Sequence, residues 1–210
     1  SNRVLRIERN VIRNCTLTQP PGTGTADDGL VWVNNLFINA FHGDYHSGWD
    51  NVFLHDTWVY DRATADIHYK LWQFKGPASV VNSLVWSDHP MPMVFQNADL
   101  DLEKYRRFQP RNNAYALPGQ ASWLVGVRKE SLSDAQWQAA GKDAGSVRVA
   151  DPDALGITRQ GEAYSISPRS PATRCADPAY RNTNDVRFRI SRDFFGKPRP
   201  EHPCAGAVEP

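Results

Sequence analysis

The chain has 210 residues, a formal net charge of +1 and a negative mean hydropathy. Because 24 basic residues balance 23 acidic ones, no general field attracts nucleic acid or an anionic membrane surface. The longest apolar runs are far below the roughly 18 residues that cross a bilayer. We therefore expect neither nucleic acid nor a membrane among the partners, and a chain of this length is most simply one domain.

Four segments align around one amide or carboxylate position, and each continues with apolar residues of strand type. The aligned residues are Asn10, Asn35, Asp56 and Asn82, with spacings of 25, 21 and 26 residues. This spacing indicates a solenoid, because units so short bury their apolar faces only by stacking. A repeated Asn at one corner can then form a hydrogen-bonded ladder along the stack. The sequence therefore predicts an all-β parallel β-helix.

The other expected elements follow in chain order. Strand segments are expected at 1–15, 28–41, 49–60, 66–73, 78–97 and, more weakly, 111–115. A Gly- and Pro-rich insertion interrupts the pattern at 19–25. Beyond residue 130, a Ser N-cap followed by helix formers predicts one short helix within 131–138, and the rest is extended. We expect residues 1–130 to form rungs, and residues 131–210 to form an irregular C-terminal cap of the same domain.

The first residues, Ser1 to Ile7, have the pattern of a strand already under way. An uncapped solenoid end exposes a layer of core side chains and unpaired strand edges. We therefore expect preceding β-helix rungs to cover Ile7 and Val11. These rungs would belong to the same polypeptide or to a cleaved companion chain.

The last part of the chain carries a series of short motifs. They are Trp137-Gln138, Gly141-Lys142-Asp143, Ser170-Pro171-Ala172, Asp193-Phe194-Phe195-Gly196-Lys197-Pro198-Arg199-Pro200 and Gly206-Ala207-Val208-Glu209. This series resembles the C-terminal end of secreted right-handed parallel β-helix proteins of the carbohydrate-active group, which includes glycoside hydrolases and polysaccharide lyases. The resemblance implies secretion, a polysaccharide or oligosaccharide partner, and a tail that braces the last rung. Because members with different chemistries share these motifs, the reaction stays open.

Of the three cysteines, Cys15 lies within the first repeat, and Cys175 and Cys204 lie in the tail. We expect Cys15 to face a packed layer. A tail without repeats needs fastening, and secreted proteins use disulfides for this purpose. The proteins that the tail resembles commonly have Gly or a hydrophobic residue at the two tail positions. A disulfide between Cys175 and Cys204 and two free thiols therefore stand as equal alternatives.

Between Asn14 and Asp61 the chain has no Lys or Arg, but it has six Asp and three His. If the segment at His46 stacks on the segment at Asp28, then Asp28, Asp44 and His46 converge on one corner of adjacent rungs. Rungs about 4.8 Å apart can place two carboxylates ~5 to 9.5 Å apart, which are the separations used in glycoside hydrolysis. Asp28 and Asp44 are thus the candidate acid and base, and His46 can share their proton.

Other residues near this corner are candidates for contact with a substrate. They are Asp27, His42, Tyr45, Trp49, His68 and Lys70. The aromatic members, together with Trp72 and Trp86, can form a platform on which sugar rings stack, or they can belong to the core. Asp residues at strand entries can also act as turn formers. Asp56, with His55 before it, is best explained as a ladder residue.

Three functions stay open at this point. The first is a secreted glycoside hydrolase that uses Asp28 and Asp44. The second is a polysaccharide lyase with Lys70 or a His as its base, although the scarcity of positive charge argues against a polyanionic substrate. The third is a noncatalytic carbohydrate-binding or structural segment. We expect no cofactor, and a Ca²⁺ site built from Asp27, Asp28, Asp44 and His46 is a weaker alternative.

Overall fold

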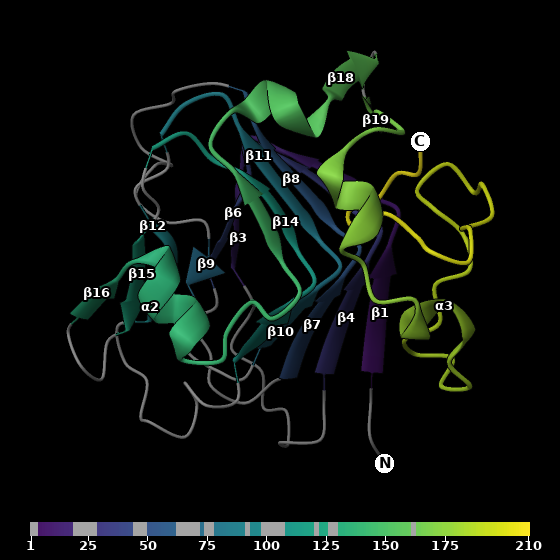
Figure 1. The fold of residues 1–210 in the computed structure, drawn as a ribbon. Coiled ribbons are helices and arrows are strands. Elements are labelled where there is room, and N and C mark those ends of the chain that lie inside the picture. The colour runs from purple at the N-terminus through teal and green to yellow at the C-terminus, as the bar shows by residue number, and fades with distance from the viewer. Residues whose placement is uncertain are drawn as a thin grey trace.

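The structure, a computed structural model, describes residues 4–18, 29–43, 50–61, 72–73, 78–90, 93–97, 108–119, 122–125, 130–160 and 163–210. Most of its regular elements are β-strands, and most of these strands pair in parallel (Figure 1). Within the described residues, helices are few, short and confined to the chain after residue 130. The prediction of an all-β fold built from parallel strands is therefore confirmed.

The strands form three main sheets (Figure 1). The first contains, side by side, β1 (Val4–Glu8), β4 (Gly29–Val33), β7 (Asp50–Leu54), β10 (Ala78–Val81) and β13 (Gln109–Arg111). The second contains β2 (Val11–Arg13), β5 (Leu36–Ile38), β8 (Thr57–Tyr60), β11 (Leu84–Ser87), β14 (Ala114–Ala116) and β17 (Val147–Val149). The third contains β3 (Thr16–Thr18), β6 (Phe41–Gly43), β9 (Trp72–Gln73), β12 (Met93–Asn97), β15 (Ser122–Val125) and β16 (Glu130–Leu132). Only β16, which is antiparallel to β15, departs from parallel pairing in these three sheets among the described residues.

We call three strands that follow one another in the chain, one from each sheet, a rung. The described rungs are β1–β3, β4–β6, β7–β9, β10–β12 and β13–β15. The register continues from rung to rung, since Ile7 pairs with Trp32, Trp32 with Phe53, and Phe53 with Val80. Because strand side chains alternate between faces, this register keeps the same face of every rung turned toward the core.

A short connection between the first and second sheets recurs in every rung. Its first residue has a φ between 53° and 56° in Arg9, Asn34, His55, Asn82 and Asn112, and after the fifth rung Gly145, with a φ of 72°, holds the same position. Left-handed backbone of this kind is best tolerated by Gly and, among other residues, by Asn and Asp. The turn therefore explains why amides recur here.

The second residue of the connection forms the ladder. Asn10 donates from its backbone N–H and its Nδ2 to Asn35 Oδ1, at 3.0 and 3.1 Å. Asn35 N–H in turn donates to Asp56 Oδ1 at 2.6 Å. The same bond, from a backbone N–H to the side-chain oxygen one rung later, continues the ladder through Ser83, Asn113 and Ser146.

The predicted ladder positions of Asn10, Asn35 and Asp56 are thus confirmed, but the prediction for Asn82 is wrong by one residue. Ser83 occupies the ladder, and Asn82 occupies the left-handed position before it. Ser83 Oγ accepts the Asp56 N–H as an amide oxygen would. The two neighbouring positions both favour small polar residues, so the sequence pattern alone did not separate them.

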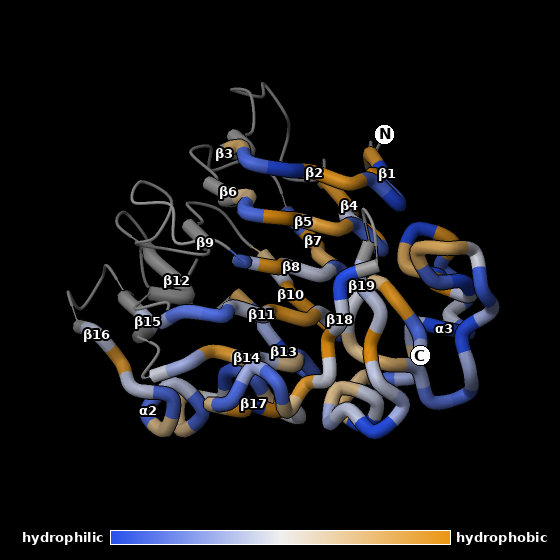
Figure 2. Tube along the Cα trace, turned by 90° about the horizontal axis from the view of Figure 1, so that it is seen from above, coloured by the Kyte–Doolittle hydropathy of each residue, from blue (hydrophilic) through white to orange (hydrophobic). Residues whose placement is uncertain are grey.

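One apolar core draws side chains from all three sheets. Aromatic rings stack across rungs, with Trp32 5.8 Å from Phe53 at an interplanar angle of 7°, and Phe37 4.9 Å from Trp58 at 10°. Figure 2 shows the rungs one above another, with apolar residues recurring along them. The stacking of successive units, on which the repeat analysis depends, is therefore present in the described strands.

The predicted helix is present as α2 (Asp134–Ala139), which begins after the N-cap Ser133. Ser133 and Gln136 form a capping box, in which each side chain bonds to the other residue's backbone. Trp137 on α2 is 1% exposed and stacks on Trp123 at 4.5 Å. In Figures 1 and 2 this helix lies at the end of the stack farthest from β1–β3, so it closes that end of the core.

After α2 and β17 the chain forms the 3-10 helix η1 (Pro152–Leu155), the hairpin β18 (Ile157–Gln160) and β19 (Ala163–Ile166), the 3-10 helix η2 (Pro171–Arg174), and α3 (Ala179–Asn182). The segment from Ser170 to Pro210, called here the tail, runs along the corner between the first and second sheets. Figure 1 shows it beside β1 and β4.

The left-handed residues of the rungs hold this tail in place. Asn34 Nδ2 donates to Arg192 O at 2.7 Å, and Asn112 Nδ2 donates to Cys175 O at 2.8 Å. Arg199, buried in the tail, forms an ion pair with Glu209 and donates to Asn34 Oδ1 at 2.7 Å. The expectation was a tail that braces the last rung, and the tail instead bonds to rungs from the second, at Asn34, to the fifth, at Asn112.

The alternative of a tail disulfide is not seen, because Cys175 and Cys204 are both buried free thiols. They belong to one apolar cluster, in which burial raises the pKa of Cys175 to about 12 and also raises the pKa of Cys204. Hydrogen bonds and packing fasten the tail in place of a bridge. Cys15, as expected, packs against the main core, where it is partly buried.

Candidate functional site

Most of the predicted site residues lie outside the residues that the structure describes. These are the proposed catalytic residues Asp28, Asp44 and His46, and the proposed substrate contacts Asp27, Tyr45, Trp49, His68 and Lys70. The backbone of His42 is described, and it lies in β6 opposite Trp72 of β9. The catalytic assignment therefore stays a prediction.

The described strands define where these chain segments begin and end. Residues 19–28 join β3 to β4, and residues 44–49 join β6 to β7, so both segments lead from the third sheet to the first. Their flanking strands are in register, with Thr18 opposite Gly43 and Gly29 opposite Asp50. The described strand ends that flank the two segments thus lie side by side, and in the sequence Asp28 adjoins the Gly29–Asp50 pair and Asp44 adjoins the Thr18–Gly43 pair.

Asp56 and His55, in the acidic stretch, were expected to have a structural role, and both are part of the packed structure. Asp56 is 0% exposed, and burial raises the pKa of its carboxyl group well above the usual value. His55 is also buried, with its Nδ1 3.0 Å from Cys204 O and its Nε2 3.0 Å from Asn82 Nδ2. Burial, and then the charge of Arg199, lower the pKa of His55 well below 6.5. Neither side chain is accessible to a substrate.

Trp86, one of the aromatic residues considered as a sugar platform, packs against the C-terminal hairpin instead. Its ring contacts the clusters that contain Ile157 and Tyr164, and its Nε1 donates to Pro152 O at 3.2 Å. This tryptophan therefore joins the second sheet to the cap. It is partly buried in this contact.

A corner that the sequence analysis did not select places two carboxylates on adjacent rungs. Asp61 and Asp88 each follow a paired residue, because Tyr60 lies opposite Ser87 in β8 and β11. Asp61 Oδ2 accepts the Tyr164 hydroxyl at 2.9 Å. Burial, followed by the bond to Asp61, raises the pKa of Tyr164 to about 12.

The second carboxylate of this corner is more open to solvent. The Asp88 side chain is 47% exposed and lies 2.6 Å from His89 Nδ1. The Ser87 hydroxyl donates to the backbone oxygen of His89 at 2.7 Å, so it is not held as a nucleophile activated by the imidazole. The adjacent Asp88-His89 pair was the only sequence signal for this corner.

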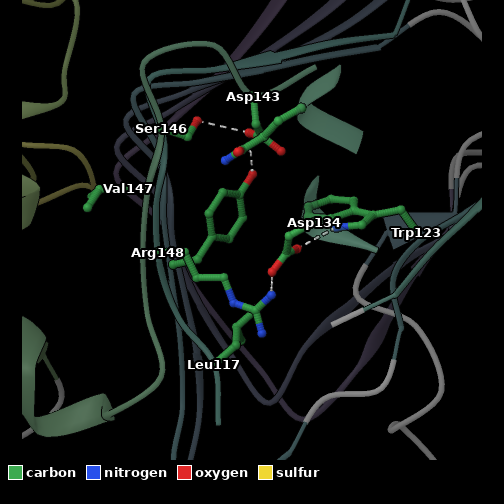
Figure 3. A pocket seen from close by; sticks show the side chains of 9 residues that line it. Leu117, Trp123, Asp134, Asp143, Ser146, Val147 and Arg148 are labelled. Atoms are coloured by element: carbon green, nitrogen blue, oxygen red, sulfur yellow. Dashed lines mark hydrogen bonds and ion pairs between the residues drawn. The ribbon is translucent and has the colours of Figure 1, made fainter. Parts of the chain in front are cut away.

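A small hollow lies between β14, β15, β17 and α2 (Figure 3). Its volume is about 40 Å³, which leaves room for only a few water molecules. It is lined by Tyr115, Leu117, Trp123, Asp134, Gln138, Asp143, Ser146, Val147 and Arg148. The hollow is therefore too small to admit a sugar ring.

Asp143 lies at the buried end of this hollow and is surrounded by donors (Figure 3). Its Oδ1 accepts from Tyr115 Oη at 2.8 Å, Ser146 Oγ at 2.9 Å and Asn113 Nδ2 at 3.2 Å. Its Oδ2 accepts from Trp137 Nε1 at 2.7 Å. Burial raises the pKa of Asp143, and these hydrogen bonds oppose that rise. With both oxygens engaged, Asp143 joins the ladder to α2.

Asp134, the other acid of the hollow, is also engaged on both oxygens. Trp123 Nε1 donates to Asp134 Oδ1 at 2.8 Å, and Arg148 forms an ion pair with Asp134 Oδ2 (Figure 3). Beside Asp143, the Lys142 amine donates to Phe108 O at 2.5 Å, and burial lowers its pKa to about 8. These charged groups hold α2 and the last rung together, and they leave no carboxylate directed into an open cleft here.

The residues that the structure describes contain no group of three or more His, Cys, Asp or Glu side chains arranged to hold a metal ion. The four side chains considered for Ca²⁺ lie outside the described ranges. Within those ranges, none of the helices is long and apolar enough to cross a membrane.

Comparisons with protein-family models, with curated proteins and with solved structures gave no match for this chain. The functional argument therefore depends on the sequence and on the geometry of the described rungs.

Proposed function

We propose that the chain is part of a secreted, closed, right-handed parallel β-helix that acts as a glycoside hydrolase on a polysaccharide or oligosaccharide. The observation that carries this proposal is the register of neighbouring rungs, with Thr18 opposite Gly43 and Gly29 opposite Asp50. Those pairings support the proposal because the strands that flank both segments are neighbours in register. Extended polymers bind well along such a stack, because equivalent side chains recur at the rung spacing of about 4.8 Å.

In the proposed reaction, one of Asp28 and Asp44 protonates the glycosidic oxygen and the other acts as base or nucleophile. A neighbouring negative charge raises the pKa of one carboxyl group, which keeps that group protonated as the acid. Carboxyl separations of about 5 Å favour retention of configuration, and separations of ~6.5 to 9.5 Å favour inversion. His42, His46 and the acidic and aromatic residues beside them would contact the sugar.

The test uses Asp28→Asn and Asp44→Asn, with Asp88→Asn as the matched control. The Asp88 side chain is 47% exposed and lies outside the proposed site, so its variant makes the same chemical change without touching that site. After a screen of neutral and acidic polysaccharides for new reducing ends, we expect each of the first two variants to lose at least about 100-fold in kcat/KM. Asp88→Asn should keep full activity. Unchanged turnover in Asp28→Asn and Asp44→Asn, with the fold intact, would refute the assignment.

The same screen separates the other two functions. A lyase that uses Lys70 or a His as base gives an unsaturated product that absorbs in the near ultraviolet, without dependence on the two Asp residues. The third function, a noncatalytic binding or structural segment, is favoured by the burial of the described aromatic rings, such as Trp58 and Trp123, in the core. Binding without turnover on every polysaccharide would support that function.

A further inference from the structure

The first rung, β1–β3, lies at one end of all three parallel sheets. Among the described residues, each of its strands therefore has a neighbour on one side only. Figure 2 shows this rung at the end of the stack that carries the N-terminus, while α2 lies at the other end. The two ends of the stack thus differ in how they are covered.

Every boundary between described rungs uses the same three hydrogen bonds at the ladder corner. Between the first and second rungs, Arg9 N–H donates to Val33 O at 3.1 Å and Leu36 N–H donates to Asn10 O at 2.9 Å. The third bond runs from Asn10 N–H to Asn35 Oδ1 at 3.0 Å. Equivalent sets recur at the next three boundaries, and a further set joins the fifth rung to Ala144, Ser146 and Val147 at the start of β17.

The outer side of the first rung presents one half of this set. By the pattern of the other rungs, Val11 N–H needs a backbone acceptor, while Glu8 O and Asn10 Oδ1 need donors. Glu8 O receives only the Asn10 Nδ2 at 3.1 Å from the described residues, and none of them donates to Asn10 Oδ1. These groups have the spacing and direction that a further ladder turn would satisfy.

The apolar side chains of this rung are uncovered in the same direction. Leu5 is 58% exposed, whereas its partner in the second rung, Leu30, is 6% exposed. Trp32 and Phe37, the second-rung partners of Ile7 and Ile12, are 7% and 0% exposed. Ile7 and Ile12 touch the main core from this side and are only partly buried. An apolar layer and an unsatisfied row of polar groups therefore coincide on one surface.

We infer that this surface binds one further parallel rung, with apolar inward side chains and with Asn, Asp or Ser at its ladder position. Continuity decides the occupant, because only a parallel rung in register reproduces the three bonds found at every other boundary. A second copy of the chain does not fit in either orientation. Head to head, its strands would run antiparallel, and its other end is closed by α2, with Trp137 buried against Trp123. This inference does not depend on hydrolase activity, so a negative result in the hydrolase assay would not contradict it.

A fusion that supplies such a rung tests the inference. A copy of residues 29–49 placed directly before Val4 puts the copied Asn35 21 residues before Asn10, the spacing between Asn35 and Asp56. The matched control carries the same residues in scrambled order. In the fusion, amide exchange at Val11 should slow at least about tenfold relative to the control, and the thermal midpoint should rise by several degrees. Equal exchange at Val11 in the two proteins, with the rest of the fold intact, would overturn the inference.

A second measurement uses the chain without a fusion. An open strand edge promotes self-association, so sedimentation should show association that grows with concentration and is abolished by Leu5→Glu. This variant should stay as stable as the parent, unlike Leu30→Glu, which buries the same charge one rung later. A discrete two-fold dimer that protects Val11 would show that a second copy occupies the surface, and a monomer with Val11 already protected would show that the surface is not open. Either result contradicts the proposal.

Discussion

Asp56→Asn is expected to stabilise the protein, although it removes a buried residue of the ladder. Asp56 Oδ1 accepts from Asn35 N–H at 2.6 Å and from Asn35 Nδ2 at 3.0 Å. Asp56 Oδ2 is buried, and no described residue donates to it. An ionised carboxylate in this position has lost its water on both oxygens and has regained partners on only one.

The neighbouring rungs show what an amide would do at this position. Asn35 Nδ2 donates to Ile7 O, and Asn113 Nδ2 donates to Val80 O, at 3.0 and 2.9 Å. In both cases the acceptor lies three residues before the ladder residue of the preceding rung. By the same geometry, an Asn at position 56 would donate to Trp32 O. The substitution therefore replaces an unpartnered oxygen with a donor that has an acceptor.

The magnitude follows from these contacts. An unsatisfied buried polar group costs about 1–3 kcal/mol, so Asp56→Asn should raise the free energy of unfolding at pH 7 by about that amount. Asp56→Ala should lower it by about 1–3 kcal/mol, because two Asn35 donors then lose their acceptor. Since burial raises the pKa of Asp56, the folded protein binds this proton more tightly than the unfolded chain does. The contribution of Asp56 to the stability of the parent therefore falls as the pH rises above the unfolded value near 3.8, and the Asn variant has no such contribution.

Urea unfolding followed by tryptophan fluorescence, for parent and variant at pH 5 and pH 8, measures this difference. The stabilisation by Asn should be larger at pH 8 than at pH 5. Other titrating groups, including His55, contribute equally to both proteins and cancel in the difference. A variant that is less stable than the parent at pH 8, or a gap that does not change with pH, would refute the reasoning.

Three further predictions concern the tail and the closed end. Because the pKa of His55 is lowered in the fold, stability should fall as the pH drops below about 6.5, by up to about 1.4 kcal/mol per pH unit, and His55→Asn should remove this loss in unfolding titrations. Because Cys175 and Cys204 are buried with raised pKa values, mass spectrometry should find neither thiol alkylated at pH 7 before urea is added. Trp137→Ala should cost about 3–5 kcal/mol of stability, and Trp137→Phe less, because Phe keeps the stacking and loses only the bond to Asp143.

The fold could be predicted from the sequence because the repeat and the ladder are both local consequences of the same turn. Spacings near 25 residues predicted which strands lie side by side, and the apolar residues after Asn10 and Asn35 marked the second sheet. The register at Asn82 could not be predicted, because the left-handed position and the ladder position both accept Asn. Only the hydrogen bond that reaches Ser83 distinguishes them.

The roles of Asp143 and His55 depend on contacts that bring distant segments together, so spacing alone did not show them. Asp143 belongs to a motif whose resemblance implied only bracing, yet its four donors come from the fifth rung, α2 and the turn after it. His55 was expected to be structural because it precedes the ladder residue Asp56, but its contact with the tail at Cys204 O could not be predicted from its position. Long-range packing decided both outcomes.

The column of left-handed residues explains why one turn serves both stacking and attachment. In this backbone conformation the residue before the ladder extends its side chain away from the core, where Asn34, Asn82 and Asn112 bond to the tail. The ladder residue beside it accepts the backbone N–H of the ladder residue in the preceding rung, and Asn35, Asp56, Ser83 and Asn113 are fully buried there. His55 also contacts the tail from this column, and its two ring contacts require one donor and one acceptor, which only the neutral imidazole provides. An Asn in its place would retain the backbone preference without a titrating group, so the acid sensitivity of the tail contact resides in this single position.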